Sequence, residues 1–274
     1  MKTILLHIHD DDQQEGRLQV ALDLARALNA HIACVQVTPV DVMVGDPRSG
    51  IDGAGIFGMA ALLGTLHDQD RALRARIETR LAHQGVRWDW RCFDGQVAET
   101  LVDQSVLADV LILSQPTTGR RDGRPALNIV GDVALYTRAP VLMVPAGAAR
   151  LVLDGPVLVA WNGSPEAAHA LRLALPILQR ASRVHVVEVS DDLPGVPATE
   201  AATWLSRQGI AADVHEWPAK GRRVSVALLH AAAELEAQAM VMGAYGHSRL
   251  RETVLGGVTR ELIQGSTVPL LLAH

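Results

Sequence analysis

Residues 241–274 read VMGAYGHSRLRETVLGGVTRELIQGSTVPLLLAH. An apolar run that ends at Met242 is followed by a glycine-rich stretch, a helical pattern that opens at Thr259, and a second apolar run from Val268 to Ala273. This order predicts a strand, a glycine loop, a helix and another strand. Glycines at such a junction let the backbone approach a ligand closely, and the free N–H groups of a helix start favour a phosphate. The segment therefore predicts a nucleotide site.

The glycines of this stretch follow a specific spacing, Gly-x2-Gly-x9-Gly, formed by Gly243, Gly246 and Gly256. This spacing, followed by Gly-Val-Thr and closed by an apolar strand, resembles the universal stress protein family. The resemblance implies that the loop holds the ribose and phosphates of ATP. Gly257 departs from the family pattern, which usually places a hydroxyl residue there, but its backbone amide remains available. The expected cofactor-binding residues are Asn162, Val189, Gly243, Gly246, His247, Ser248, Gly256, Gly257, Val258 and Thr259.

The resemblance also implies an adenine-contacting residue, usually aspartate, after the first strand of each unit. Its place falls at His9 or Asp10 in the first half and at Asn162 in the second. An asparagine still accepts and donates hydrogen bonds, although it removes a charge beside the ligand. An alternative interpretation needs no ligand: Asn162 opens a turn in which Ser164 caps a helix and Pro165 takes its first position. The sequence leaves both interpretations open.

Internal repetition divides the chain into two similar halves. Residues 4–9 align with residues 157–162, residues 108–113 with 237–242, and Pro140 with Pro269. The predicted domains are 1–147 and 154–274. The 274 residues, 49% of them hydrophobic, provide enough chain and core for two domains of ordinary size.

Strand and helix patterns alternate within each half, which predicts an α/β fold of two tandem doubly wound parallel sheets. The family resemblance implies that these sheets are of the Rossmann-like, adenine nucleotide alpha hydrolase-like type. The elements expected in the first half are strands at 3–9, 30–38, 87–93, 110–114 and 141–144, with helices at about 15–28, 61–83, 98–105 and 130–136. The family resemblance implies that the halves pack as a pseudo-dimer, with residues 141–144 and 268–272 at the seam. The proline alignment places Ser114, Thr117, Leu127 and Asn128 at the positions of the motif glycines, so only the second half is expected to bind a nucleotide.

Charge and composition limit the choice of partner. The formal net charge is −5, and the sequence provides no basic patch, so no nucleic-acid partner is expected. No apolar run reaches the roughly 20 residues of a membrane-spanning helix. Cys34 and Cys92 lack a metal-ligand spacing and are expected to be free thiols. With no signal-peptide pattern at Met1, these features favour a cytoplasmic protein.

Catalytic and metal signatures are weak. The sequence contains no Gly-x4-Gly-Lys-[Ser/Thr] loop and no Gly-x-Ser-x-Gly elbow, so no catalytic residue is named and at most slow ATP hydrolysis is expected. His7 and His9 share one face of a strand, but no third ligand accompanies them, so no metal site is predicted there or elsewhere.

The predicted function is an ATP-binding stress-response or regulatory protein; AMP, ADP and magnesium remain alternatives or additions. Homo-oligomerisation and an unidentified protein partner are also expected. Two other functions stay open. One is a scaffold that binds no nucleotide, and the other is a carrier of a small apolar ligand under a flap at residues 42–64, which are rich in glycine and apolar residues. Without a ligand, the same segment is expected to be a loop packed over the pseudo-dimer interface.

Overall fold

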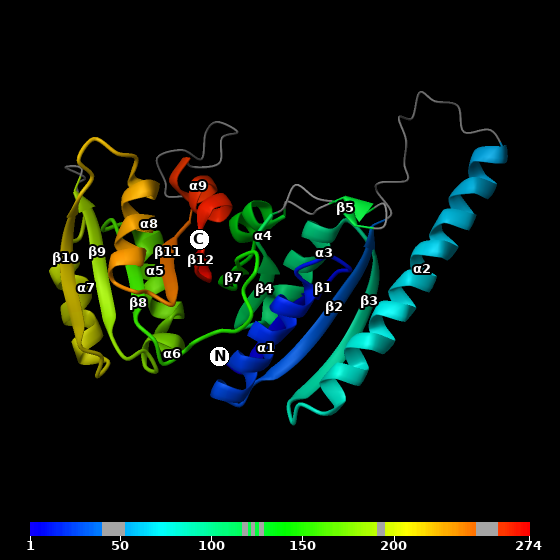
Figure 1. The fold of residues 1–274 in the computed structure, drawn as a ribbon, viewed down its shortest axis with the longest axis horizontal. Coiled ribbons are helices and arrows are strands. Elements are labelled where there is room, and N and C mark those ends of the chain that lie inside the picture. Colours follow the sequence, from blue (N-terminus) through cyan, green and yellow to red (C-terminus); the bar gives the residue numbers. More distant parts are fainter. Residues whose placement is uncertain (40–52, 117–119, 122–123, 126–128, 191–194, 245–256) are drawn as a thin grey trace.

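A ten-stranded sheet runs through the whole molecule (Figure 1). The computed structural model describes residues 1–39, 53–116, 120–121, 124–125, 129–190, 195–244 and 257–274. The strand order is β10-β9-β8-β11-β12-β7-β4-β1-β2-β3. Within each group of five the strands are parallel, and both groups have the same doubly wound order. The predicted tandem α/β fold is confirmed.

The sheet takes five strands from each half of the chain. In the first half they are β1 (Thr3–Ile8), β2 (His31–Pro39), β3 (Arg87–Gly95), β4 (Val110–Ser114) and β7 (Val141–Val144). In the second half they are β8 (Val157–Trp161), β9 (Val184–Ser190), β10 (Ala212–Pro218), β11 (Ala239–Gly243) and β12 (Leu270–Ala273). A separate two-stranded ribbon pairs β5 (Arg120–Arg121) with β6 (Arg124–Pro125). The last large strand begins two residues later than predicted, because Pro269 has no N–H to donate to a sheet ladder.

Equivalent hydrogen bonds confirm the alignment of the halves. The backbone N–H of Leu111 donates to the carbonyl of Pro140, and that of Met240 donates to the carbonyl of Pro269, both at 2.9 Å. The two prolines therefore accept equivalent hydrogen bonds, one just before β7 and the other just before β12.

The two halves meet at an antiparallel strand pair. β12 pairs with β7, with Leu271 opposite Leu142 and Leu272 opposite Val141. All four side chains are buried. The seam lies where the sequence predicted it, and it joins two five-stranded sheets edge to edge into one continuous sheet.

Helices cover both faces of the sheet. One apolar core contains buried residues of α1 (Gln14–Leu28), α2 (Gly53–Ala82), α5 (Pro165–Leu173), α6 (Leu175–Leu178) and α7 (Ala198–Arg207). The other contains buried residues of α3 (Val97–Gln104), α4 (Val130–Tyr136), α8 (Val224–Glu234) and α9 (Gly257–Gly265). A single 3-10 turn, η2 (Ser105–Leu107), follows α3. Both cores continue across the seam, so burial on both faces stabilises the pairing of the halves.

The predicted flap at residues 42–64 needs correction. Residues 53–64 belong to α2, a helix of 30 residues that packs against β2 near the β3 edge, far from the β7–β12 seam (Figure 1). The helix-forming alanine, leucine and methionine residues of this stretch outweigh the cost of its glycines. Residues 53–64 are therefore neither a flap nor a loop over the interface, and residues 42–52 lie outside the described part of the chain.

The segment between β7 and β8, which contains the predicted domain boundary, packs on the first half. The backbone N–H of Leu151 donates to Asp23 Oδ2 of α1 at 2.9 Å, and Leu151 and Leu153 are both buried. A Cβ on Gly16 would lie 2.5 Å from the carbonyl oxygen of Ala148. This close fit keeps the segment against α1.

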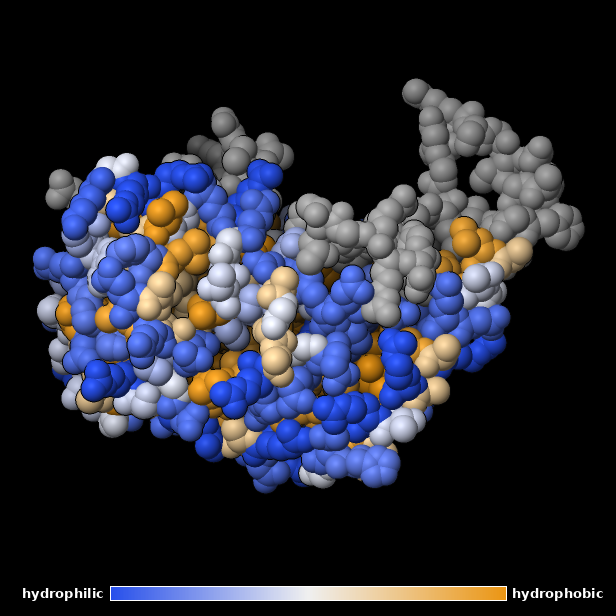
Figure 2. Space-filling view, in the orientation of Figure 1, coloured by the Kyte–Doolittle hydropathy of each residue, from blue (hydrophilic) through white to orange (hydrophobic). Residues whose placement is uncertain are grey.

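The surface is mainly hydrophilic in the view of Figure 2, with apolar side chains in small separate groups. Among the described residues, no helix combines the length and the apolar character that crossing a bilayer requires.

Candidate functional site

The candidate site lies at the carboxyl ends of the strands of the second half. There β11 runs between β8 and β12, with Met242 opposite Ala160 and Gly243 opposite Ala273. Asn162 follows β8 directly, and α9, the next described element after β11, begins at Gly257. Parallel α/β sheets bind their ligands at this edge. The fold therefore brings Asn162, Gly243 and the start of α9 to one side of the sheet.

Asn162 is exposed and forms part of the turn that starts α5. Its Oδ1 accepts a hydrogen bond from the N–H of Ser164 at 3.2 Å, and Ser164 Oγ accepts one from the N–H of Ala167 at 3.1 Å. Pro165 takes the first position of the helix. The predicted helix cap by Ser164 is confirmed, and the turn before it engages the oxygen of the Asn162 side-chain amide.

The next residue, Gly163, lies in the turn between β8 and α5 and packs against the segment before α7. Its φ is +71°, and an added Cβ would lie 2.5 Å from the backbone nitrogen of Val196. Its carbonyl accepts a hydrogen bond from that nitrogen at 3.2 Å, and Trp161 Nε1 donates to the carbonyl of Val196 at 2.7 Å. This backbone contact holds the Asn162 turn in one position.

Gly243 serves helix packing. A Cβ there would lie 2.5 Å from the backbone nitrogen of Ala167 and 2.6 Å from the carbonyl carbon of Glu166. The first turn of α5 therefore crosses β11 at a distance that only glycine allows.

The start of α9 is exposed at Gly257, where an added Cβ would have no heavy atom within 4 Å. Val258 is partly buried and Thr259 is buried, so Gly257 is the exposed residue among the first three of the helix. Gly246, His247, Ser248 and Gly256 lie outside the described residues.

Val189 lies near the carboxyl end of β9, opposite Trp217 of β10. Its side chain is partly buried against the core beneath α8. Val189 thus lies at the same carboxyl end of the strands as Asn162, but β8 lies between its strand and β11.

An ion pair joins the first turns of α8 and α9. Glu261 accepts hydrogen bonds from Ser225 and Arg223. The hydrogen bond from Ser225, together with the charge of Arg223, holds the pKa of Glu261 below its usual value. Arg223 therefore partly neutralises the negative charge of Glu261 in α9.

His274 lies beside the candidate site, although no motif in the sequence points to it. Its Nδ1 lies 3.0 Å from the carbonyl oxygen of Ala244, the residue after β11. Only the pairing of β11 with β12 places the last residue of the chain here.

The equivalent edge of the first half is filled by protein. Arg17, 1% exposed, donates from Nε to the carbonyl of His7 at 2.8 Å and from Nη2 to the carbonyl of His9 at 3.0 Å. It also forms an ion pair with Asp11 at 3.1 Å and a hydrogen bond with Ser114. One guanidinium thus links the ends of β1 and β4.

The two residues expected at the adenine position of the first half are engaged by the protein. The backbone N–H of His9 donates to Gln14 Oε1 at 2.9 Å, and Asp10 forms an ion pair with Arg76 of α2 at 2.8 Å. The rings of His7 and His9 stack with their centroids 5.8 Å apart, and both side chains are buried.

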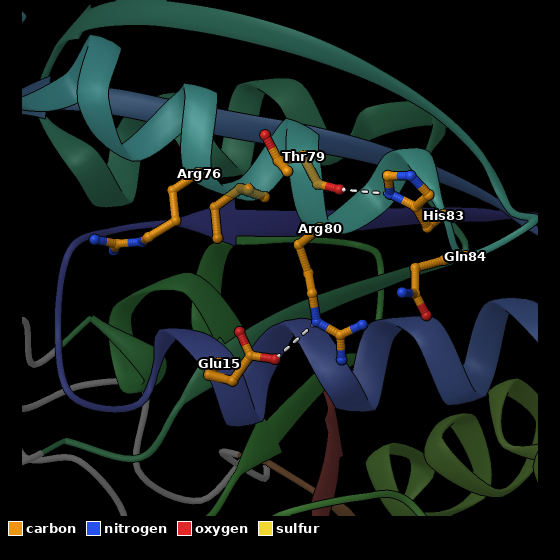
Figure 3. A pocket seen from close by; sticks show the side chains of 7 residues that line it. Glu15, Arg76, Thr79, Arg80, His83 and Gln84 are labelled. Carbon is orange, nitrogen blue, oxygen red and sulfur yellow. Dashed lines mark hydrogen bonds and ion pairs between the residues drawn. The ribbon is translucent and has the colours of Figure 1, made fainter.

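A surface hollow between α1 and α2 is a separate feature (Figure 3). Its polar side chains are engaged within the protein: Arg80 Nε lies 3.2 Å from Glu15 Oε1, and His83 Nδ1 lies 3.2 Å from the carbonyl of Thr79. Because these side chains are paired within the protein, the hollow offers no clear ligand chemistry.

Comparison with known proteins gives a family match at the carboxyl-terminal end of the chain and a fold for nearly all of it. The model of the universal stress protein family matches residues 214–274. A universal stress protein from Archaeoglobus fulgidus DSM 4304 has a similar structure, with a TM-score of 0.73, 18% sequence identity, and coverage of 99% of this chain and 97% of that chain. The structure of a universal stress protein described as putative, from Pseudomonas aeruginosa UCBPP-PA14, gives a TM-score of 0.61, 17% identity, and coverage of 100% and 93%. No curated protein matches the sequence.

The fold and the pairing of β7 with β12 define a tandem α/β protein with two doubly wound halves in one sheet. Over nearly its whole length this is also the fold of a solved universal stress protein, and residues 214–274 match the family model. The resemblance to the universal stress protein family is confirmed.

Proposed function

We propose that this universal stress protein binds one adenine nucleotide, ATP with magnesium, at the carboxyl edge of its second half and acts as a regulatory protein in the stress response. The observation that carries the proposal is the exposed first turn of α9 at Gly257, next to the end of β11. The family match over residues 214–274 covers this same segment.

The chemistry of a helix start supports a phosphate ligand. The first N–H groups of α9 have no partner within the helix, and the helix dipole adds positive potential there. Gly257 itself adds no side chain between these N–H groups and a phosphate. Asn162 on the adjoining strand is exposed, and its amide NH₂ supplies a donor for an adenine ring nitrogen.

The contrast between the halves supports a single site. Arg17 occupies the switch point of the first half and is held there by backbone carbonyls and by Asp11. A nucleotide at that position would have to displace a buried ion pair, which costs several kcal/mol.

A pair of substitutions at Gly257 tests the proposal. Gly257→Asp places a carboxylate at the helix start, where it stabilises the helix but repels a phosphate. Gly257→Asn has nearly the same size without the charge. In calorimetric titrations with Mg-ATP, we expect one nucleotide per wild-type chain, weaker binding by Gly257→Asn, and a loss of at least about tenfold more for Gly257→Asp.

Two results would count against the proposal. One is the absence of ATP binding by the wild type, and the other is equal binding by Gly257→Asp and the wild type. Thermal unfolding of both variants provides the folding control, because an added Cβ at Gly257 meets no heavy atom of the described residues within 4 Å.

A second candidate function is a scaffold that binds no nucleotide and acts through protein contacts. Two observations favour it: Gly243 is required by the packing of α5, and the Asn162 turn is a complete helix cap. Neither residue therefore needs a ligand to explain it. A wild-type chain that binds no adenine nucleotide would support this candidate.

The proposal includes a cytoplasmic location, a protein partner that responds to the bound nucleotide, and association of chains into homo-oligomers. Cys34 and Cys92 are free thiols, which fits a reducing compartment.

A further inference from the structure

Three side chains that commonly bind metals converge near the amino-terminal ends of β9 and β10. His185 Nδ1 lies 3.0 Å from His215 Nε2 and 3.7 Å from Asp213 Oδ2. One ligand atom from each residue lies within 4.8 Å of the other two. In the part of the chain that the structure describes, this is the only such group of three.

The strand register explains the cluster. Asp213 of β10 is directly opposite His185 of β9, and His215 is two residues further along β10. Side chains two residues apart on a strand point to the same face, so all three project from one face of the sheet. Val187 of β9 and Trp217 of β10 continue this face into the core beneath α8.

The spacing of the ligand atoms suits a small divalent cation. Tetrahedral zinc binds histidine nitrogen at about 2.0–2.1 Å, which puts two ligand atoms about 3.3–3.4 Å apart. The nitrogen atoms of His185 and His215 are 3.0 Å apart, so a shift of a few tenths of an ångström opens the site. In that arrangement the metal replaces the proton between the two rings.

Access also suits a metal. The His185 side chain is 7% exposed, whereas that of Asp213 is 66% exposed. The site thus has a buried ligand, His185, and is open to water at Asp213.

We propose that His185, Asp213 and His215 form a binding site for Zn²⁺ or a chemically similar divalent transition metal, with water completing the coordination. Two imidazoles and one carboxylate form a ligand set that zinc accepts. The site lies near the amino-terminal ends of the strands, whereas the proposed nucleotide site lies at their carboxyl ends. The metal site does not depend on the nucleotide site. Because β10 is the outermost strand of the sheet, a metal bound here links β10 to β9 and stabilises their pairing.

Calorimetric titration of ZnCl₂ into the full chain, prepared without a polyhistidine tag, tests the proposal. We expect one Zn²⁺ per chain, with affinity lowered at least about tenfold in Asp213→Asn and in His215→Gln. Zinc is also expected to raise the melting temperature of the wild type but not that of Asp213→Asn.

His31→Gln is the matched control. His31 Nε2 lies 2.6 Å from Asp89 Oδ1 on the adjacent strands β2 and β3, and within the described residues no third ligand joins this pair. This variant should keep wild-type zinc affinity. The proposal is overturned if the wild type binds no zinc, if Asp213→Asn binds it as tightly as the wild type, or if His31→Gln weakens binding as much as His215→Gln. Should His215→Gln fail to fold, the exposed Asp213→Asn decides the outcome.

Discussion

Ser114 and Gly243 occupy equivalent positions, each at the carboxyl end of the strand next to the seam strand of its half. Ser114 is opposite Val144, and Gly243 is opposite Ala273. Ser114 accepts a hydrogen bond from Arg17, whereas Gly243 leaves room for the first turn of α5. The same backbone position therefore holds a side chain that binds Arg17 in the first half, and a glycine that lets α5 pack closely in the second half.

Gly243→Ala is expected to lower the free energy of unfolding by about 1–3 kcal/mol, because the new Cβ would lie 2.5 Å from the backbone of Ala167. Urea unfolding of the variant and the wild type measures the difference. Gly64→Ala is the control, because there is open space around Gly64. Gly85→Ala is not suitable, because the φ of Gly85 is +66°. Equal stability of Gly243→Ala and the wild type would show that α5 does not need the glycine.

Arg17→Met is expected to cost about 3–5 kcal/mol, because it removes one partner of a buried ion pair and leaves the carbonyls of His7 and His9 without their donor. Arg26→Met, on the same helix but 43% exposed, should change stability by less than about 1 kcal/mol. Thermal and urea unfolding of both variants test this contrast, and similar losses in the two would contradict it.

Stability should fall in mild acid through His7. Burial, together with the positive charges of Arg17 and His9, lowers the pKa of His7 well below its usual value. The unfolded chain then takes up a proton near pH 6.5 that the folded chain does not, so this contribution is present above pH 6.5 and lost below it. The wild type is therefore expected to lose stability as the pH falls from 7 to 5.

His7→Leu should therefore lose less stability over this pH range than the wild type. Urea unfolding at pH 7, 6 and 5 measures both slopes. Parallel slopes would mean that His7 does not contribute to the acid sensitivity.

Gln115→Leu is expected to weaken the contact between the halves by about 1–3 kcal/mol. Gln115 Nε2 donates to the carbonyls of Ile263 and Gln264 at 3.0 Å, and Oε1 accepts from the N–H of Ala146 at 2.9 Å. Its side chain thus joins the end of β4 to the end of α9. Urea unfolding and limited proteolysis at the segment after β7 measure the loss, and unchanged stability would contradict this role.

Much of the fold could be predicted because its signals are local or repeated. The apolar runs at Val110–Ser114 and Val141–Val144 are the observed strands β4 and β7, and the shared prolines aligned the halves correctly. The start of α2 was missed because the glycines of residues 53–64 indicate a loop, while the helix-forming residues between them form the first turns of a long helix.

The sites were harder to predict, since they depend on contacts between distant residues. Asn162 and Gly257 could be placed from the motif, but the meeting of Arg17 with Ser114 requires the packing of α1 on β4. The approach of His185 to His215 likewise requires the register of β9 with β10, although the Asp213-x-His215 pattern on a strand was a usable signal.

The most direct test of the account is a crystal structure of the full chain grown with magnesium and a non-hydrolysable ATP analogue. The account predicts one nucleotide per chain, with phosphates at the start of α9 near Gly257, adenine beside Asn162, and Arg17 still in contact with Asp11. A nucleotide bound in the first half, or a second half without nucleotide at saturating concentration, would contradict it.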